Sequence, residues 1–188
     1  MDSKIVYLGF DGSCEPNPGL GGYGSIIQFG SKQIRIAGAD PETTNNRMEI
    51  MGLLRGLEVV LERGMVGHLQ IIGDSEYVLK SASVWMWKWK RKNFKKKANV
   101  DLWKKMDVIL TKALEQFDSV TYWWIRGHSG HLLNELCDEL SFRLVNNESR
   151  VEKQYELEQT LEVDLSVCSL VLKQSRLQPG ISGPEEKL

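Results

Sequence analysis

Residues 6–14 read Val-Tyr-Leu-Gly-Phe-Asp-Gly-Ser-Cys, and the interpretation of the whole chain starts from this stretch. Apolar residues lead to a single acid, Asp11, and a glycine follows at once. A carboxylate in an apolar strand is unfavourable to bury without a partner, and a bound cation is a common partner for clustered acids. Alternatively, Asp11 caps a turn, because Asp-Gly is a frequent turn pair. This stretch alone leaves both interpretations open.

Hydrophobic patterns extend from this strand along the rest of the chain. Apolar runs predict five strands, at residues 4–12, 25–29, 33–37, 69–73 and 120–125. Helical spacing predicts helices at residues 46–63 and 76–82, from Asn99 or Asp101 onward, and from Asn134 to about residue 147. Residues 17–24 and 40–46 are rich in turn-forming residues and are predicted to be loops.

The order of these elements predicts the fold class. The first three strands are joined by short connections, which is typical of an antiparallel meander. The later strands follow helices, and a strand–helix–strand crossing places two strands parallel in one sheet. We therefore expect an α/β fold with a mixed five-stranded sheet flanked by helices, in which a three-stranded antiparallel meander continues into parallel strands.

The chain length of 188 residues accommodates one domain and a tail, and we expect the domain to occupy residues 1–148. Glutamate and polar residues dominate from residue 149 until an apolar run at 163–172, which predicts one strand. The proline- and glycine-rich residues 179–184 are predicted to be disordered. We interpret residues 149–188 as an acidic, partly disordered C-terminal extension.

The composition excludes several classes of protein. The net charge of −1 identifies no partner. The three cysteines, Cys14, Cys137 and Cys168, form no CxxC pair, which indicates free thiols in a reducing compartment. No apolar run approaches the roughly 20 residues of a membrane span, and the N-terminus has no signal-peptide pattern. We expect a soluble, cytoplasmic protein without a membrane partner.

Four acids are candidate metal ligands: Asp11, Glu49, Asp74 and Asp138. Asp11 and Asp74 are predicted to end strands, and the other two to lie near helix starts, so helices that cover one sheet bring all four together. Four converging carboxylates repel one another, and oxygen ligands favour magnesium or manganese over zinc. Each acid taken alone is equally well explained as a cap or a solvated charge.

Five blocks of residues occur in the order and spacing of one known family. They are Asp-Gly-Ser-Cys at 11–14, Asn-Pro-Gly-Leu-Gly-Gly-Tyr-Gly at 17–24, Thr-Asn-Asn-Arg-Met-Glu at 44–49, Asp-Ser-Glu-Tyr-Val at 74–78, and a block that begins with His-Ser-Gly-His at 128–131 and ends with Cys137 and Asp138. With these blocks the chain resembles type 1 ribonuclease H over residues 3–147.

The resemblance implies an RNase H-like fold and an endonuclease that cuts the RNA strand of an RNA–DNA hybrid. Asp11, Glu49, Asp74 and Asp138 match the family's metal-binding acids, and Asp11 would bridge two magnesium ions, for which manganese can substitute. A two-metal mechanism would give 5′-phosphate and 3′-hydroxyl ends. His128 matches a catalytic histidine on a mobile loop, although a surface histidine is the ordinary alternative. We expect a monomer.

The resemblance also assigns contacts to the hybrid. Backbone groups of Gly12, Ser13 and Cys14, with the side chains of Glu49 and Glu76, would read the 2′-hydroxyl of RNA. Asn17 and Asn45 match positions that contact the nucleic-acid strands, and Thr44 and Asn46 match positions of the DNA-phosphate pocket. The tryptophan- and lysine-rich residues 85–97 resemble the family's basic protrusion, with DNA-strand contacts predicted at Trp85, Lys88, Trp89, Lys90, Arg91 and Lys92. Rings spaced four residues apart also fit a packed helix face, which leaves the role of Trp87 open.

The chain departs from the family pattern at three places. Glu76 stands where glutamine is usual, Leu132-Leu133 replaces a proline-containing pair, and Lys88 replaces a polar amide. Alternative hypotheses are another nuclease of the same superfold, a hybrid-binding module without activity, and a domain of a reverse transcriptase. A binding module would be expected to lose one of the four acids, and all four are present.

Overall fold

The strand that carries Asp11 is β1 (Ile5–Cys14). In the computed structural model, which describes residues 4–95, 97–145, 152–157 and 159–175, β1 pairs antiparallel with β2 (Gly19–Phe29), and β2 pairs antiparallel with β3 (Lys32–Thr43). On its other side β1 pairs parallel with β4 (His68–Gly73), which pairs parallel with β5 (Ser119–Trp124). The predicted meander with parallel strands beside it is therefore confirmed.

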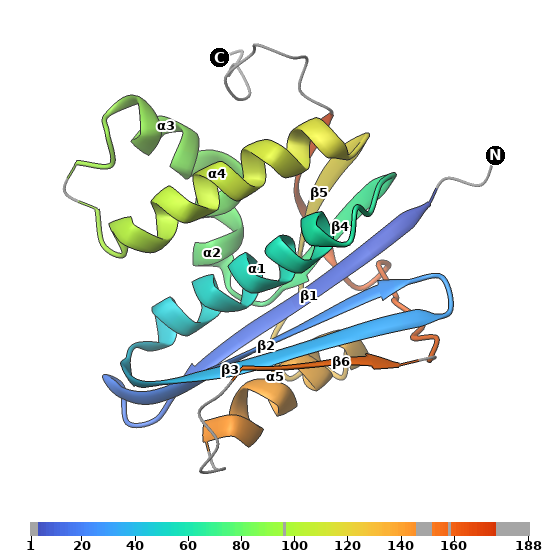
Figure 1. Cartoon of the computed structure of the whole chain (residues 1–188), viewed down its shortest axis with the longest axis horizontal. Coiled ribbons are helices and arrows are strands. Elements are labelled where there is room, and N and C mark those ends of the chain that lie inside the picture. The colour runs from blue at the N-terminus through green and yellow to red at the C-terminus, as the bar shows by residue number, and fades with distance from the viewer. Residues whose placement is uncertain (1–3, 96, 146–151, 158, 176–188) are drawn as a thin grey trace.

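The number of strands differs from the prediction, because the sheet has seven strands rather than five. β6 (Lys153–Leu157) pairs antiparallel with β3 and β7 (Ser169–Ser175) with β5, which gives the order β6-β3-β2-β1-β4-β5-β7 (Figure 1). Both extra strands come from the C-terminal extension. β6 has a polar sequence without an apolar run. Its composition therefore does not predict a strand, although its backbone pairs with β3.

The strand predicted at 163–172 begins later than expected, at Ser169. Its early apolar residues, Val163 and Leu165, pack against the core from a segment that is not a strand. The predicted disorder at 179–184 lies outside the described residues. The proposed domain boundary at residue 148 also falls outside them and stays a prediction.

The loops predicted at 17–24 and 40–46 are wrong over most of their length, because β2 begins at Gly19 and β3 continues to Thr43. The glycines that indicated turns instead allow close packing on β2. A Cβ atom at Gly24 would lie 2.4 Å from the carbonyl oxygen of Cys137. Asp11 was also predicted to end its strand, whereas β1 continues for three residues beyond it, to Cys14.

The helices lie on both sides of the sheet (Figure 1). α1 (Asn45–Glu62) and α4 (Val100–Gln116) lie on one side, and α5 (Leu132–Val145) lies on the other. After β4 the chain forms α2 (Glu76–Lys80), a π-helical turn η1 (Ser81–Trp85) and α3 (Met86–Arg91). Among the described helices, none combines the length and the apolar composition needed to cross a membrane.

Two clusters of buried side chains hold these layers together. The larger cluster joins α1 and α4 to the sheet and contains Leu8, Leu57 and the fully buried Trp103. The second cluster joins α5 to the opposite face and contains Ile26, Ile72, Ile125, Leu133, Cys137 and Leu161. Because Leu161 belongs to the C-terminal extension, the extension contributes to the second core as well as to the sheet.

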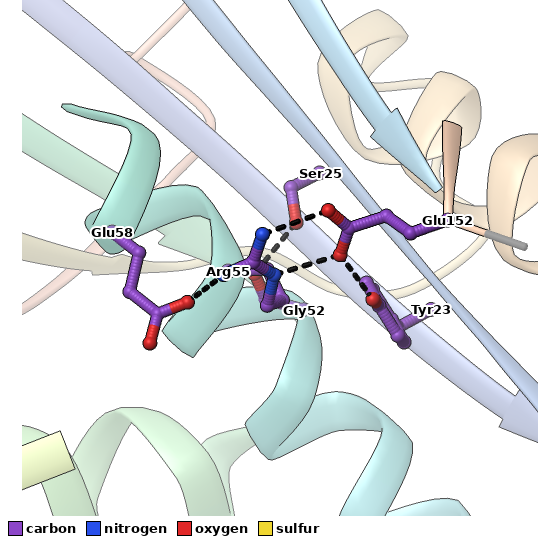
Figure 2. Close-up of polar contacts among 6 residues, drawn as sticks. All are labelled: Tyr23, Ser25, Gly52, Arg55, Glu58 and Glu152. Atoms are coloured by element: carbon purple, nitrogen blue, oxygen red, sulfur yellow. Dashed lines mark hydrogen bonds and ion pairs between the residues drawn. The ribbon is translucent and has the colours of Figure 1, made fainter. Parts of the chain in front are cut away.

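Glu152, which precedes β6, ties the C-terminal extension to β2 and α1 (Figure 2). Its carboxylate accepts two hydrogen bonds of 2.7 Å from the Arg55 guanidinium and one of 2.5 Å from the Tyr23 hydroxyl. Arg55 also pairs with Glu58. The bonds from Arg55, and then that from Tyr23, lower the pKa of Glu152 below its ordinary value. The bidentate ion pair between Arg55 and Glu152 is half-buried, and such a pair is stronger than an exposed ion pair.

Glu152→Gln is expected to lower the free energy of unfolding by about 1–3 kcal/mol, because Arg55 then loses its charged partner in a half-buried position. Urea unfolding at pH 7 measures the change. Glu156→Gln is the matched control, because Glu156 pairs with Arg63 at 3.4 Å on the surface and its loss should be below about 0.5 kcal/mol. Equal losses in the two variants would contradict the anchoring role of Glu152.

Candidate active site

Asp11 lies at the centre of the candidate site, on the middle strand of the sheet. The residue is 8% exposed, and its Oδ1 accepts a hydrogen bond of 2.7 Å from the backbone N–H of Gly12. Burial first, and then the charges of Asp74, Asp138 and Glu49, together raise the pKa of Asp11 to about 8 against the hydrogen bond from Gly12. The structure therefore brings the four predicted acids into one electrostatic cluster.

The other three acids come from separate elements. Glu49 lies in the first turns of α1, Asp74 directly follows β4, and Asp138 lies on α5. Each element packs beside β1, because β4 is its parallel neighbour while α1 and α5 cover its two faces. Chain segments that are far apart in sequence thus deliver carboxylates to one place.

Hydrogen bonds from neutral groups hold two of these acids. Glu49 accepts bonds from the Ser75 hydroxyl at 2.6 Å and from the Asn45 side-chain amide at 3.2 Å. Burial raises the pKa of Glu49, and the charge of Asp74 acts in the same direction, against the bond from Ser75. The side-chain amide of Asn134 donates to Asp74 Oδ2 at 3.2 Å. These partners orient the carboxylates without neutralising them.

The donor chemistry of the cluster fits a hard divalent cation, because its side chains offer carboxylate oxygens, the ligands that such cations prefer. In the present orientation of their side chains, no three His, Cys, Asp or Glu residues of the described part of the chain form a group that could hold a metal ion. Closing such a ligand set requires the carboxylates to turn toward a shared ion. The magnesium site predicted from the sequence therefore stays a prediction.

His128 lies on the loop of residues 126–131, between β5 and α5, with its side chain 79% exposed. Its Nδ1 is 3.7 Å from Asp138 Oδ2, the nearest acid of the cluster. The backbone of His128 has a φ of 51°, a left-handed conformation that is unusual for residues other than glycine and is often found at functional loops. A Cβ atom at the preceding residue, Gly127, would lie 2.7 Å from Asp74 Oδ2, so a larger residue there would displace this carboxylate.

The residues predicted to contact the hybrid through the start of α1 lie together. Asn17 Oδ1 accepts a hydrogen bond of 3.2 Å from the backbone N–H of Asn45. Thr44 caps α1 by accepting from the backbone of Arg47, and the neighbouring Asn46 is exposed. This part of α1 is therefore held against the loop that precedes β2.

The residues predicted to contact the 2′-hydroxyl come from three elements, β1, α1 and α2. Ser13 accepts a hydrogen bond of 3.2 Å from the Ser141 hydroxyl of α5, and the thiol of Cys14 is buried against the carbonyl of Pro16. Glu76, in the first turn of α2, is exposed and pairs with Lys80 at 3.0 Å. The carboxylate that departs from the family pattern is thus paired with a lysine on its own helix.

The basic protrusion, residues 85–97, separates its aromatic rings into two groups. Trp87 is 7% exposed and belongs to the larger core cluster, which resolves its role as structural packing. Trp85 is 38% exposed, and its ring lies 6.3 Å from that of the half-buried Trp89. Lys97 lies over the ring of Trp89 at 5.0 Å.

The basic side chains described in the protrusion are exposed to solvent. Exposed positions include Lys88, Arg91, Lys92 and Lys95. Lys90 pairs with Asp107 of α4 at 2.9 Å, so part of its charge is used within the protein.

Sequence reasoning missed three residues that shape the site, namely Ser75, Gly127 and Asn134 in its role as a partner of Asp74. Ser75 directly follows one acid and Gly127 directly precedes His128, so proximity to a candidate residue was the available signal. Their partners lie on other elements, and nothing in the linear sequence identifies those pairs.

Comparison with known proteins gives consistent relatives. The family model described as RNase H matches residues 2–145. A ribonuclease H of Syntrophotalea carbinolica is 40% identical over 143 residues, which make up 73% of this chain and 89% of that protein. A ribonuclease H of a Sulfurovum species is 42% identical over 138 residues, covering 73% of this chain and 88% of that protein.

Solved structures share the architecture at lower sequence identity. LC9-RNase H1, a type 1 RNase H with the type 2 active-site motif, is similar with a TM-score of 0.68 at 22% identity, over 80% of this chain and 76% of that chain. LC11-RNase H1 in complex with an RNA/DNA hybrid has a TM-score of 0.56 at 21% identity, over 75% of this chain and 96% of that chain. These likenesses show the common fold.

In metal-free buffer, the Asp11→Asn variant is expected to lose less stability than the wild type as the pH rises. The Asp11 carboxyl has a pKa of 3.8 as its ordinary value and about 8 in the folded protein, so the folded state holds the proton more tightly. The free energy of unfolding of the wild type therefore falls as the pH rises between these values, by on the order of 1–3 kcal/mol. The variant has no carboxyl group at this position and should not show this fall.

Urea unfolding at pH 5 and pH 8 in the presence of a chelator measures this difference. The exposed Asp118 provides the control variant Asp118→Asn, which should follow the wild type. If Asp11→Asn and the wild type lost the same stability between the two pH values, the inference that burial disfavours the ionised form of Asp11 would be wrong.

Proposed function

This chain belongs to the ribonuclease H family and is a nuclease, and we propose that it hydrolyses the RNA strand of RNA–DNA hybrids with divalent metal ions at the Asp11 cluster. The observation that carries the proposal is the convergence of Asp11, Glu49, Asp74 and Asp138 around the middle strand. Burial and the neighbouring acids raise the pKa of Asp11, so its anion is unfavourable at this place unless a cation stabilises it.

Two magnesium ions, or manganese ions in their place, would be held by these four carboxylates. When bound, such ions supply an activated water and stabilise charge on the leaving oxygen of an in-line displacement. The proposed products carry 5′-phosphate and 3′-hydroxyl ends.

The protein's own groups orient this chemistry. Asn45 and Ser75 hold the two oxygens of Glu49, and Asn134 holds one oxygen of Asp74. His128 lies beside Asp138 on an exposed loop, and we assign to it the movement of a proton or the release of product.

Selection of the RNA strand requires recognition of the 2′-hydroxyl, which distinguishes RNA from DNA. We assign this recognition to the backbone of Gly12, Ser13 and Cys14 together with Glu49 and Glu76. Thr44 and Asn46 at the start of α1 would contact a phosphate of the DNA strand, and Asn17 and Asn45 would contact the nucleic-acid strands. The DNA strand would then reach the rings and basic side chains of the protrusion.

The decisive test is cleavage of an end-labelled RNA–DNA hybrid beside RNA–RNA and DNA–DNA duplexes, each with magnesium, manganese or chelator. We expect metal-dependent cutting of the RNA in the hybrid alone. Asp11→Asn should lose at least about 100-fold in activity while still binding the hybrid, because an amide no longer supplies the anionic ligand. Asp118→Asn is the charge-matched control and should retain activity.

Cutting of the DNA duplex would instead favour another nuclease of the same superfold. Tight hybrid binding without cutting under any condition would favour a binding module.

The triple variant Arg91→Gln, Lys92→Gln, Lys95→Gln is expected to raise KM for the hybrid and leave kcat nearly unchanged, because these exposed cations meet phosphates in binding. The logarithmic slope of KM against salt should fall by about 2–3. Steady-state kinetics from 50 to 200 mM salt measure both effects.

Lys4→Gln, Lys32→Gln, Lys112→Gln removes the same charge at exposed positions outside the protrusion and should change KM little. A loss confined to kcat in the protrusion variant would contradict the assigned role.

A further inference from the structure

The C-terminal extension passes from one edge of the sheet to the other and contacts the face covered by α5. β6 pairs with β3 at the first edge, and β7 pairs with β5 at the second (Figure 1). Residues 159–168 connect these strands, and we call them the crossing segment. Leu161 fixes the crossing segment, because its side chain is 5% exposed in the second core and its backbone N–H donates to Gln28 Oε1 at 3.1 Å.

The crossing segment reaches the loop that carries His128 through one buried histidine, His131. Its Nε2 lies 3.1 Å from the backbone carbonyl oxygen of Asp164. A carbonyl oxygen only accepts, so Nε2 carries the hydrogen and donates it. His131 is 6% exposed, which shields this bond from water.

His131 stands at the junction between the His128 loop and α5. Its own carbonyl oxygen accepts a hydrogen bond of 3.0 Å from the backbone N–H of Glu135, which closes the first turn of the helix. Three residues before it lies His128, and seven residues after it lies Asp138, the acid that faces His128 at 3.7 Å. A shift of His131 therefore changes how these two side chains meet.

Other residues of the loop share a cleft with the crossing segment. Arg126, Ser129 and Gly130 of the loop line this cleft together with Glu162, Asp164 and Val167 of the crossing segment. Within the loop, Ser129 bonds to the carbonyl of Arg126, and Gly130 bonds to Glu135, both of them close in sequence. The His131 bond to Asp164 thus bridges from the loop to a distant part of the chain.

The described part of the C-terminal extension, residues 152–157 and 159–175, is held at both of its ends. Glu152 is bonded to Arg55 and Tyr23 at the first end (Figure 2), and β7 is paired along β5 at the second. The carbonyl that His131 uses is therefore a fixed point of the fold and not the tip of a free tail.

We propose that the C-terminal extension positions the His128 loop through the hydrogen bond from His131 to the carbonyl of Asp164. His131 is then a positioning residue, which acts on the reaction through His128 and does not touch the substrate. The proposal rests on the proposed function and adds to it a role for residues 152–175, which lie beyond the matched family region.

The test compares full-length wild type, His131→Phe and His131→Gln in hybrid cleavage, each also combined with His128→Ala. His131→Phe keeps a ring but loses the donor, and we expect kcat to fall about three- to tenfold with KM within about twofold. His131→Gln retains a donor and should recover at least half of the lost kcat. In the His128→Ala background, His131→Phe should lower kcat by less than about twofold, because the residue that it positions is already absent.

His68→Phe is the matched control. His68 also makes a hydrogen bond through one ring nitrogen, to Ser119 at 2.8 Å, but at the start of β4 and not on the loop. The kcat of the His68→Phe variant should equal that of the wild type. Equal kcat values for His131→Phe and the wild type, or the same fold-loss with and without His128, would overturn the proposal.

Amide hydrogen exchange of residues 126–131 tests the same contact without relying on activity. Exchange in this loop should be faster in His131→Phe than in the wild type or His68→Phe. Leu161→Ala, which loosens the crossing segment and leaves His131 intact, should accelerate the same amides and serves if His131→Phe does not fold. Unchanged exchange would overturn the proposal. Inactivity of the wild type toward hybrids, with faster exchange in His131→Phe, would refute the proposed function alone.

Discussion

Asp11 lies on the middle strand of the sheet with 8% of its surface exposed, and three other carboxylates lie close enough to raise its pKa. Such a group destabilises the folded state when it is ionised, since both burial and like charge oppose the anion. The surrounding fold must therefore hold the acids in place against their mutual repulsion. The two cores on either side of the sheet supply that stabilisation, and the site lies where their helices approach β1.

The polar groups around the acids follow from the same constraint. Hydrogen bonds from Asn45, Ser75 and Asn134 orient carboxylates and leave their charge intact. A lysine or arginine at these positions would neutralise the cluster and remove its attraction for a cation. The basic residues gather instead on the protrusion, where they suit phosphate contacts, and Trp87 anchors that segment in the larger core.

The C-terminal extension shows how a segment of polar composition becomes part of a folded domain. β6 and β7 cover the two edges of the sheet, which would otherwise present unpaired backbone groups. Glu152 and Leu161 fix the extension to opposite faces, through a charged hydrogen-bond network and through the second core. Just beyond Leu161, at Asp164, the chain contacts the His128 loop, so an addition to the sheet edges also reaches the candidate site.

The sequence by itself determined the family, the meander with its parallel strands and the main helices, because these depend on local periodicity and on motifs of fixed spacing. It also predicted the four acids as a set, from the same motifs. It misjudged residues 17–24, since glycines that permit close approach look the same as glycines that form turns. It also left out β6 and the partners Ser75 and Asn134. Only the tertiary structure decided those features, because edge pairing and hydrogen bonds between distant elements depend on which backbone and side-chain groups meet in space. The role of Trp87 was settled in the same way, by burial.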